Sequence, residues 1–335
     1  MDISQNILLT GAGFSHNFGG FLADGMWSQI FNHPEIQDRQ LIKDVLLKDF
    51  DYESIYNEVL LGETGKWFDS DRTAIKTAVL EAYRQLDQLI LNYNKHPNID
   101  YMYAVNKFIE RFSGDMRTIG FFFTLNQDIF VERFYNSSNK PLVLPKMKRI
   151  PDYSSNDRRK SMLQEGDFIT VIRGNDSTWI PADQLSNLEL HYVKLHGSFN
   201  WKSSDGSNIM VIGKDKEHQI SREPLLRWYA DIFKQVLSQK DRRILIIGYR
   251  FRDKHINQII AAAVKEHGLK IYVVSPEGPR DFIKKLEHSE TDHCPFGSDI
   301  LEGLSGYFPY KLLEALEGDQ FKLLNKHYFL ENQRP

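Results

Sequence analysis

The chain reads Ile7-Leu8-Leu9-Thr10-Gly11-Ala12-Gly13-Phe14-Ser15 near its start, a short apolar run that leads directly into a glycine turn. Such a run, bounded by a turn former, is typical of a strand buried on both faces of a sheet. Glycines after the strand permit a tight turn, and the helix that follows can then present N–H groups to a phosphate. The usual dinucleotide fingerprint has a third glycine where this chain has His16, so the pattern alone also fits a plain tight turn.

Four later runs share this design, since each is short, apolar and followed by a polar residue or a glycine. They are Phe121-Phe122-Phe123 before Thr124, Val193-Lys194-Leu195 before His196, Ile244-Leu245-Ile246-Ile247 before Gly248, and Ile271-Tyr272-Val273-Val274 before Ser275. Strands of this kind belong to parallel sheets that are covered by helices. The sequence therefore predicts an α/β fold with a Rossmann-like open parallel sheet of about six strands.

The residues that follow the five runs should meet at one edge of the sheet. They are Thr10, Thr124, His196, Gly248 and Ser275. In an open α/β sheet, ligands bind beyond the carboxyl ends of the strands. A binding site at this edge explains all five residues together.

The chain between the first two strands has a different pattern. Apolar residues recur at helical spacing between Asp71 and Ile90, with Ser70 or Asp71 as the helix cap. This spacing predicts a mainly helical insertion at about 31–115. A further helix is expected to start near Asp253.

One large domain is predicted for residues 1–280, and it carries the helical insertion and a second, loop-rich insertion at about 136–190. The loop-rich insertion is basic at about 140–160, which indicates either a solvated loop or a docking surface for a partner. Residues 281–335 are expected to form a helical C-terminal extension.

Composition excludes several classes of protein. The chain has 335 residues, 41% of them hydrophobic, and a net charge of −3, so neither a disordered chain nor direct nucleic-acid binding is expected. The single cysteine, Cys294, excludes an internal disulfide framework and a cysteine-rich zinc site. No signal peptide or membrane-spanning run is visible, so a cytoplasmic protein without a membrane partner is expected.

Three residues are candidates for chemistry. Asn126 and Asp128 follow the aromatic strand directly, although both residue types also cap helices routinely. His196 ends the third run and can act as a general base near neutral pH, although a lone histidine also serves structural roles. His288, His293 and Cys294 are interpreted as a surface cluster rather than a metal site, and no metal ligands are assigned.

The ordered set of motifs resembles the sirtuin family, and within it the sirtuin-like domains of bacterial antiphage defence systems. The motifs are Gly11-Ala12-Gly13-Phe14-Ser15, Thr124-x-Asn126-x-Asp128, His196-Gly197 and Gly248-Tyr249-Arg250-Phe251-Arg252-Asp253, with Asp51-Tyr52-Glu53-Ser54-Ile55 inside the helical insertion. The resemblance implies that NAD is the substrate.

The resemblance also implies roles for individual residues. Gly11, Ala12, Gly13, Phe14 and Ser15 would hold the diphosphate and the neighbouring ribose of NAD, with Thr124 beside them. Asn126 would orient the nicotinamide ribose or an attacking water, Asp128 would hold the carboxamide, and His196 would be the general base. Gly248, Tyr249 and Ser275 would line the adenosine side, and Asp253 would serve there too or cap a helix.

The departures from the family pattern set the expected activity. Protein deacylases carry a four-cysteine zinc module after the histidine, which one cysteine cannot build, so no structural zinc is expected. An NAD glycohydrolase that yields nicotinamide and ADP-ribose is therefore expected, acting as the NAD-depleting effector of an abortive-infection antiviral defence. A protein deacylase and a non-catalytic NAD or ADP-ribose binding module are the alternatives.

The resemblance extends to partners. An unrestrained NADase would harm its own cell, so control through a homo-oligomer or a separate regulatory protein is expected. A HerA-type hexameric ATPase is the first candidate, and an argonaute-type protein is the second.

Overall fold

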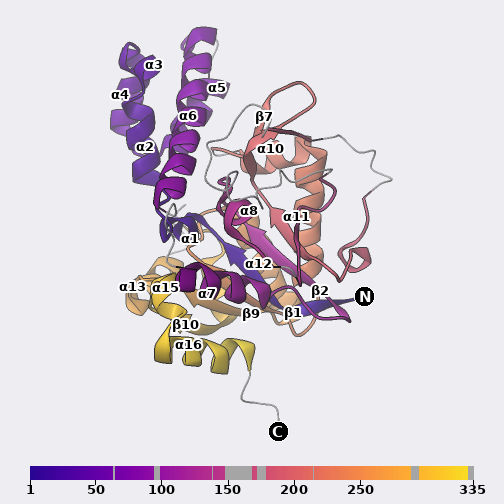
Figure 1. Ribbon diagram of the computed structural model, residues 1–335. Coiled ribbons are helices and arrows are strands. Elements are labelled where there is room, and N and C mark those ends of the chain that lie inside the picture. Colours follow the sequence, from indigo (N-terminus) through magenta and orange to yellow (C-terminus); the bar gives the residue numbers. More distant parts are fainter. Residues whose placement is uncertain are drawn as a thin grey trace.

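The protein is built on a seven-stranded parallel sheet with the strand order β10-β9-β8-β1-β2-β5-β3 (Figure 1). Its strands are β1 (Asp2–Thr10), β2 (Thr118–Thr124), β3 (Leu142–Val143), β5 (Leu190–Lys194), β8 (Arg243–Ile247), β9 (Lys270–Val274) and β10 (Leu304–Phe308). The computed structural model describes residues 1–62, 65–93, 99–137, 139–147, 168–171, 179–213, 215–287 and 294–330. The five runs predicted as parallel strands are confirmed.

A second, three-stranded sheet continues from the first. It has the order β4-β6-β7 and consists of β4 (Ile169–Thr170), β6 (Gly197–Lys202) and β7 (Asn208–Met210). Strand β6 pairs parallel with β4 and antiparallel with β7. Since β5 ends at Lys194 and β6 begins at Gly197, the turn between the two sheets consists of Leu195 and His196.

Helices surround the main sheet and extend well beyond it (Figure 1). In chain order they are α1 (Ala12–His16), α2 (Ala23–Phe31), α3 (Pro34–Gln37), α4 (Gln40–Lys48), α5 (Tyr52–Leu61), α6 (Asp69–Tyr93), α7 (Ile99–Glu110), α8 (Phe130–Phe134), the 3-10 turn η3 (Ala182–Gln184), α10 (Lys216–Arg222), α11 (Pro224–Leu237), α12 (Lys254–His267), α13 (Pro279–Glu287), α14 (Gly297–Glu302), α15 (Leu312–Ala315), α16 (Gly318–Leu324) and the π-helical turn η4 (Asn325–Phe329). The residues between β1 and β2 are thus mainly helical, as predicted.

The aromatic residues of β2 show why this strand lies at the centre of the fold. Side chains alternate between the two faces of a sheet, and the ring of Phe123 packs on Phe233 of α11 at 4.8 Å between centroids. The ring of Phe122 packs on the other side against Phe14 of α1, at 6.2 Å. Because helices cover both faces, the aromatic centre of the strand is apolar on both sides, and Phe121, Phe122 and Phe123 are fully buried.

Helices α2 to α6 form an arm that projects from the carboxyl edge of the sheet, at the top left of Figure 1. One buried ion pair joins the arm to the body, because the Arg133 guanidinium of α8 holds the Asp87 carboxylate of α6 with two bonds of 2.9 and 2.7 Å. Helix α6 begins at Asp69, so the predicted caps Ser70 and Asp71 lie in its first turn instead. There the Asp71 carboxylate accepts a hydrogen bond from the amide of Phe68.

The C-terminal region differs in one respect from the helical extension that was predicted. Helices α15 and α16 are present, but β10 precedes them and forms the edge of the main sheet. Its sequence, Leu304-Ser305-Gly306-Tyr307-Phe308, is only partly buried, which suits an edge strand and gives no continuous apolar run. The sheet therefore has seven strands rather than about six.

Parts of the predicted basic loop can be placed. Lys140 donates its ammonium to the carbonyl of Asn187 at 2.8 Å, so this lysine is tied to the body of the protein. The remaining basic positions Lys148, Arg149, Arg158, Arg159 and Lys160 lie outside the described residues. Among the described helices, none is both long and apolar enough to cross a membrane.

Candidate active site

The strand order reverses at β1, which lies between β2 and β8. The chain first adds β2 and β5 on one side of β1, and later adds β8, β9 and β10 on the other. Ligands of open α/β sheets bind at such a switch point, outside the carboxyl ends of the strands. Thr10, Thr124, Gly248 and Ser275 follow or end four of these strands and lie at this edge, as predicted.

The glycine turn after β1 lies against the glycine after β8. A Cβ atom on Gly11 would come within 2.8 Å of the Gly248 carbonyl oxygen, and one on Gly13 would come within 2.7 Å of the Gly248 Cα. Gly248 itself has a φ of +67°, a left-handed conformation that favours glycine. These glycines allow two backbone turns to touch at the switch point.

The turn presents fewer free N–H groups than its sequence suggests. The amide of Gly11 donates to the Ile247 carbonyl and that of Gly13 to the Gly248 carbonyl, both at 3.0 Å, and Phe14 donates to Gly11. Only the first N–H groups of a helix lack a partner within it, and Ala12 begins α1. The turn therefore has fewer amides free to bind a phosphate than its sequence predicts.

A hydrogen-bonded chain joins the glycine turn to the segment after β2. The Asn126 side-chain amide donates to the Ser15 hydroxyl at 2.8 Å, and its backbone amide donates to the Thr124 hydroxyl. The Thr10 hydroxyl donates to that of Thr124, also at 2.8 Å. All four side chains are buried, so their positions are set by these bonds rather than by water.

Asp128 and its neighbours hold the local backbone in place. The Asp128 carboxylate accepts a hydrogen bond from the amide of Phe130, the first residue of α8, so it contributes to the start of that helix. The buried ammonium of Lys194 donates to the Asp128 carbonyl and pairs with Glu132 at 2.8 Å. Asp128 is thus not the N-cap of α8, which is Ile129, but its carboxylate supports the turn that leads into the helix.

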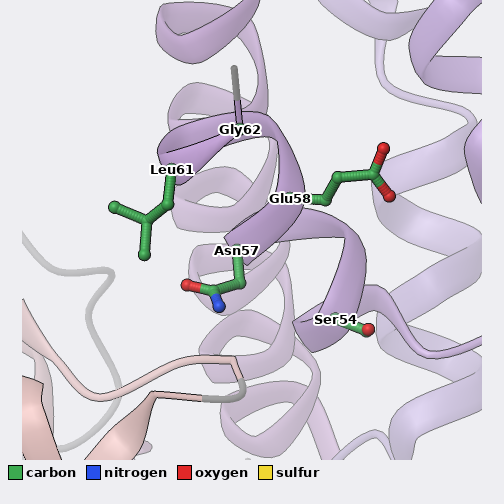
Figure 2. A pocket seen from close by; sticks show the side chains of 5 residues that line it. All are labelled: Ser54, Asn57, Glu58, Leu61 and Gly62. Carbon is green, nitrogen blue, oxygen red and sulfur yellow. The ribbon is translucent and has the colours of Figure 1, made fainter.

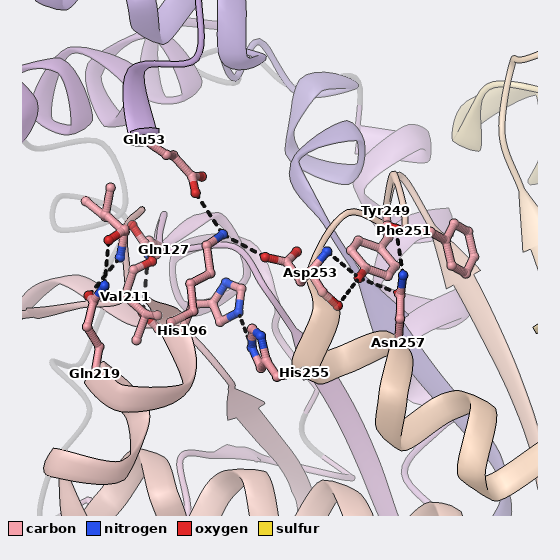
Figure 3. A network of polar contacts seen from close by, with 12 residues as sticks. Glu53, Gln127, His196, Val211, Gln219, Tyr249, Phe251, Asp253, His255 and Asn257 are labelled. Carbon is pink, nitrogen blue, oxygen red and sulfur yellow. Dashed lines mark hydrogen bonds and ion pairs between the residues drawn. The ribbon is translucent and has the colours of Figure 1, made fainter. Parts of the chain in front are cut away.

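His196 lies in the turn between β5 and β6, where it is 3% exposed. The Gln127 side-chain amide donates to the His196 carbonyl at 3.3 Å and to the Val211 carbonyl at 2.8 Å (Figure 3). Gln127, which directly follows Asn126 in the chain, therefore holds the backbone of His196 next to this segment. Burial lowers the pKa of His196 well below its ordinary value, so the imidazole is neutral at pH 7 and can accept a proton.

A second histidine, His255, faces the first. The Nε2 atoms of His196 and His255 lie 3.0 Å apart, within hydrogen-bonding distance (Figure 3). His255 belongs to the first turn of α12. Burial lowers its pKa to about 4, so both imidazoles are neutral and one ring must donate the hydrogen atom that the other accepts.

A chain of charges lies beside the two histidines. The Lys216 ammonium on α10 pairs with Asp253 at 2.6 Å and with Glu53 of α5 at 2.7 Å. Burial alone would raise the pKa of Asp253, but the Lys216 ammonium and the two neighbouring histidines together outweigh it and lower that pKa to about 2. Since Glu53 belongs to the projecting arm, the ion pairs join the arm to this edge of the sheet.

Three residues that were predicted for the adenosine side, Asp253, Tyr249 and Ser275, have different surroundings in the structure. Asp253 precedes α12 but makes no side-chain cap, because its carboxylate pairs with Lys216 and lies close to His196. The Tyr249 hydroxyl accepts the Asp253 amide and donates to Asn257, so it stabilises the loop before α12 (Figure 3). Ser275 contacts Phe308 and Glu277 at the end of β9 instead.

Sequence reasoning missed His255, Lys216 and the charge role of Glu53. The motif around Glu53 was noticed, but nothing in its spacing indicates that an arm helix returns to the sheet edge. His255 could have been found, because it lies two residues after Asp253 at the start of a helix that follows a buried strand. Lys216 carries no local signal, since its role depends on partners from two distant segments.

Other features lie away from this edge. A surface depression of about 350 Å³ is lined by Ser54, Asn57, Glu58, Leu61 and Gly62. The side chains of Asn57 and Leu61 point to one side of α5, and those of Ser54 and Glu58 point to the other (Figure 2). Cys294 is fully buried, and burial raises the pKa of its thiol to about 11. The prediction that it belongs to a surface cluster is therefore wrong. His288 and His293 lie outside the described residues.

A comparison with protein-family models identifies the family of the chain. Residues 120–294, just over half of the chain, match the family model described as a SIR2-like domain. The matched range contains Asn126, Asp128, His196, Gly248 and Asp253, whereas the glycine turn after β1 lies before it. No curated protein matches the chain.

Proposed function

Because the chain belongs to the SIR2-like domain family, whose functions involve NAD, we propose that it is an NAD glycohydrolase. The reaction breaks the bond between nicotinamide and ribose and adds water, so that NAD and H₂O give nicotinamide, ADP-ribose and a proton. The proposal rests on the residues at the carboxyl edge of the sheet. It extends the family's general relation to NAD to one defined reaction.

The observation that carries the proposal is the buried, neutral His196 beside the Asn126 segment. Gln127 bonds to the backbone of His196, and Asn126 in turn bonds to Ser15 of the glycine turn. A base, an amide and a glycine turn from three distant segments thus meet at the switch point.

The residues suggest a division of labour in the reaction. Cleavage develops positive charge at the anomeric carbon of the ribose, as in glycoside hydrolysis. We assign Asn126 to orient the ribose or the incoming water, and His196 to take the proton that the water releases. Asp128 would hold the carboxamide of nicotinamide. General-base assistance of this kind contributes about 10²–10⁴-fold to a rate.

The binding residues follow from the same arrangement. Gly11, Ala12, Gly13, Phe14 and Ser15, with Thr124, would hold the diphosphate and the nearer ribose, where the touching glycines leave backbone rather than side chains at the surface. Gly248, Tyr249 and Ser275 would lie on the adenosine side. Asp253 lies near His196, so we assign it to the reaction side.

Two other activities make different predictions. A deacylase would consume NAD only when an acyl-lysine peptide is present, and the family's four-cysteine zinc module cannot be built from Cys294 alone. A binding module would return NAD unchanged after long incubation. The base at His196 favours catalysis over binding alone, and the single cysteine favours hydrolysis over deacylation.

The biological setting is proposed from the resemblance to defence domains. In it the protein would deplete NAD as the effector of an abortive-infection response to phage. Control would come from a homo-oligomer or from a separate partner, with a HerA-type ATPase first and an argonaute-type protein second. Purification together with the products of neighbouring genes, followed by sizing and an NAD assay, tests this setting.

The decisive experiment is incubation of the purified chain with NAD, with and without those partners, and identification of the products. Nicotinamide and ADP-ribose are expected. His196→Ala and Asn126→Ala should each lower turnover by about 10²-fold or more. His218→Ala, which changes an exposed histidine on α10, is the matched control and should leave turnover unchanged. Full activity in correctly folded His196→Ala and Asn126→Ala proteins would refute the assignment.

A further inference from the structure

We propose that His196, Asp253 and His255 form a binding site for a divalent transition-metal ion of the Zn²⁺ class. These side chains come from the β5–β6 turn and from the start of α12. One ligand atom from each lies within 4.8 Å of the other two. The site was not foreseen from the sequence, where no metal ligands were assigned.

The geometry is close to that of a coordinated ion. Zinc binds imidazole nitrogen and carboxylate oxygen at about 2.0–2.2 Å, so the ligand atoms of a tetrahedral site lie roughly 3.4 Å apart. The two Nε2 atoms are 3.0 Å apart and point toward one another (Figure 3). Small rotations of the imidazole and carboxylate groups are enough to bring all three ligand atoms around one ion.

The donor set selects the class of metal. Two imidazoles and one carboxylate suit Zn²⁺, Fe²⁺, Co²⁺ or Ni²⁺, whereas Mg²⁺ and Ca²⁺ prefer oxygen ligands alone. Three protein ligands leave a fourth position open, as in catalytic rather than structural zinc sites. In the hydrogen bond between the two Nε2 atoms one ring carries the hydrogen, so that hydrogen must move to Nδ1 of the same ring before both Nε2 atoms can bind one ion.

The surrounding charges allow a dication to enter. Asp253 and Glu53 carry two negative charges, and Lys216 carries one positive charge between them. Lys216 occupies Oδ1 of Asp253, and it would keep Glu53 as its partner if Asp253 turned toward a metal. Lys216 is therefore a competitor of the metal, which gives the proposal a test with a defined direction.

The backbone of two of the ligands is held in place by hydrogen bonds. Gln127 donates to the carbonyl of His196, and the Asp253 amide donates to the Tyr249 hydroxyl. These bonds fix the backbone on both sides of the cluster. Only the three side chains need to adjust when an ion binds.

Metal binding would oppose the proposed reaction, and this consequence alone rests on the proposed function. The metal would take the lone pair of His196 that accepts the proton from water. Added Zn²⁺ should then inhibit NAD cleavage, and a chelator should restore it. An ion at this position would keep the site inactive until the ion is removed.

The test uses the full chain without an affinity tag and Co²⁺ as a spectroscopic probe, with Zn²⁺ displacing it. We expect one ion per chain with visible absorption typical of low coordination. His255→Ala should weaken binding by about 100-fold or more, and His218→Ala should leave it unchanged. Lys216→Met should strengthen binding, and Lys216→Gln repeats that arm if the first variant does not fold.

The outcomes separate this proposal from the proposed function. Equal Co²⁺ binding by the wild type and His255→Ala, or weaker binding by both folded Lys216 variants, would overturn the metal site. The Co²⁺ spectrum needs no NAD turnover, so a metal site is established or refuted even in a chain that cleaves no NAD. Conversely, NAD cleavage that persists without any specific Co²⁺ site supports the proposed function and refutes this one.

Discussion

The side-chain amide of Asn126 donates to the hydroxyl of Ser15 at 2.8 Å, although 111 positions separate the two residues in the chain. Asn126 follows β2 and Ser15 belongs to α1. The bond therefore joins the segment before the projecting arm to the segment after it. Both side chains are buried. The bond sets the direction of the amide that we assign to the ribose or the attacking water.

Ser15→Ala should therefore lower NAD turnover without unfolding the protein. One hydrogen bond between neutral groups contributes about 1 kcal/mol, which corresponds to a loss of roughly fivefold in rate. The measurement is the rate of nicotinamide release, with thermal unfolding as the check on the fold. Ser305→Ala, on the exposed part of β10, is the control, and equal rates in the two variants would show that the bond does not matter.

Gly248→Ala should destabilise the protein far more than Gly268→Ala. Both glycines have a left-handed φ, +67° and +70°, which costs an alanine about 1–2 kcal/mol. Only at Gly248 would the added Cβ also meet backbone, at 2.3 Å from the Phe14 nitrogen, whereas nothing lies within 4 Å at Gly268. Urea unfolding measures the difference, and equal losses would show that the two turns do not touch.

Asp87→Ala should strongly destabilise the attachment of the arm. It removes a carboxylate that pairs with the fully buried Arg133 guanidinium, and breaking such a pair costs about 3–5 kcal/mol. Chemical denaturation checks this value. Asp319→Ala removes one member of an exposed pair with Lys322 and should have no measurable effect. A small loss for Asp87→Ala would mean that water reaches Arg133.

Stability should fall as the pH is lowered below about 6.5, in part because of His191. Burial lowers the pKa of His191 although its Nε2 donates to the Ser186 carbonyl, and its buried Nδ1 has no partner among the described residues. Below the ordinary value of 6.5 the unfolded chain binds a proton that the folded chain does not. Each such proton lowers the unfolding free energy by up to about 1.4 kcal/mol per pH unit.

The measurement is the unfolding free energy between pH 7.5 and 5.5. His191→Phe, which places a second ring next to Phe121, should flatten this dependence. Part of the slope should remain, because His196 and His255 are also buried and neutral. A variant whose slope equals that of the wild type would show that His191 does not contribute.

The fold was largely predictable because its main signals are local. Five buried strands each need a continuous apolar run, and a parallel sheet requires that their ends meet at one edge. Strand β10 was not predicted because an edge strand is only partly buried and needs no continuous apolar run. It can therefore contain Ser305 and Gly306. The predicted start of α6 lies two or three residues too late, because Asp71 bonds to Phe68 from inside the helix rather than as its cap.

The site was predictable only where its residues follow a strand. Asn126 and His196 stand at strand ends, and the structure places both at the expected edge. Glu53 and Lys216 reach the same place from the arm and from α10, through ion pairs that depend on the tertiary fold. No pattern in the neighbouring sequence indicates such a contact. The pairing of His255 with His196 likewise joins residues that are 59 positions apart in the chain.

The contact between Gly13 and Gly248 also has a consequence for synthesis and folding. Strand β1 precedes its partners β2 and β8 in the chain by more than 100 positions, and the Tyr328 hydroxyl, which bonds to the Ile7 amide, lies 321 positions after Ile7. Contacts so distant in sequence form slowly, because the intervening chain must be ordered first. A nascent chain therefore has no complete switch point until β8 has been synthesised, and the site can form only after that.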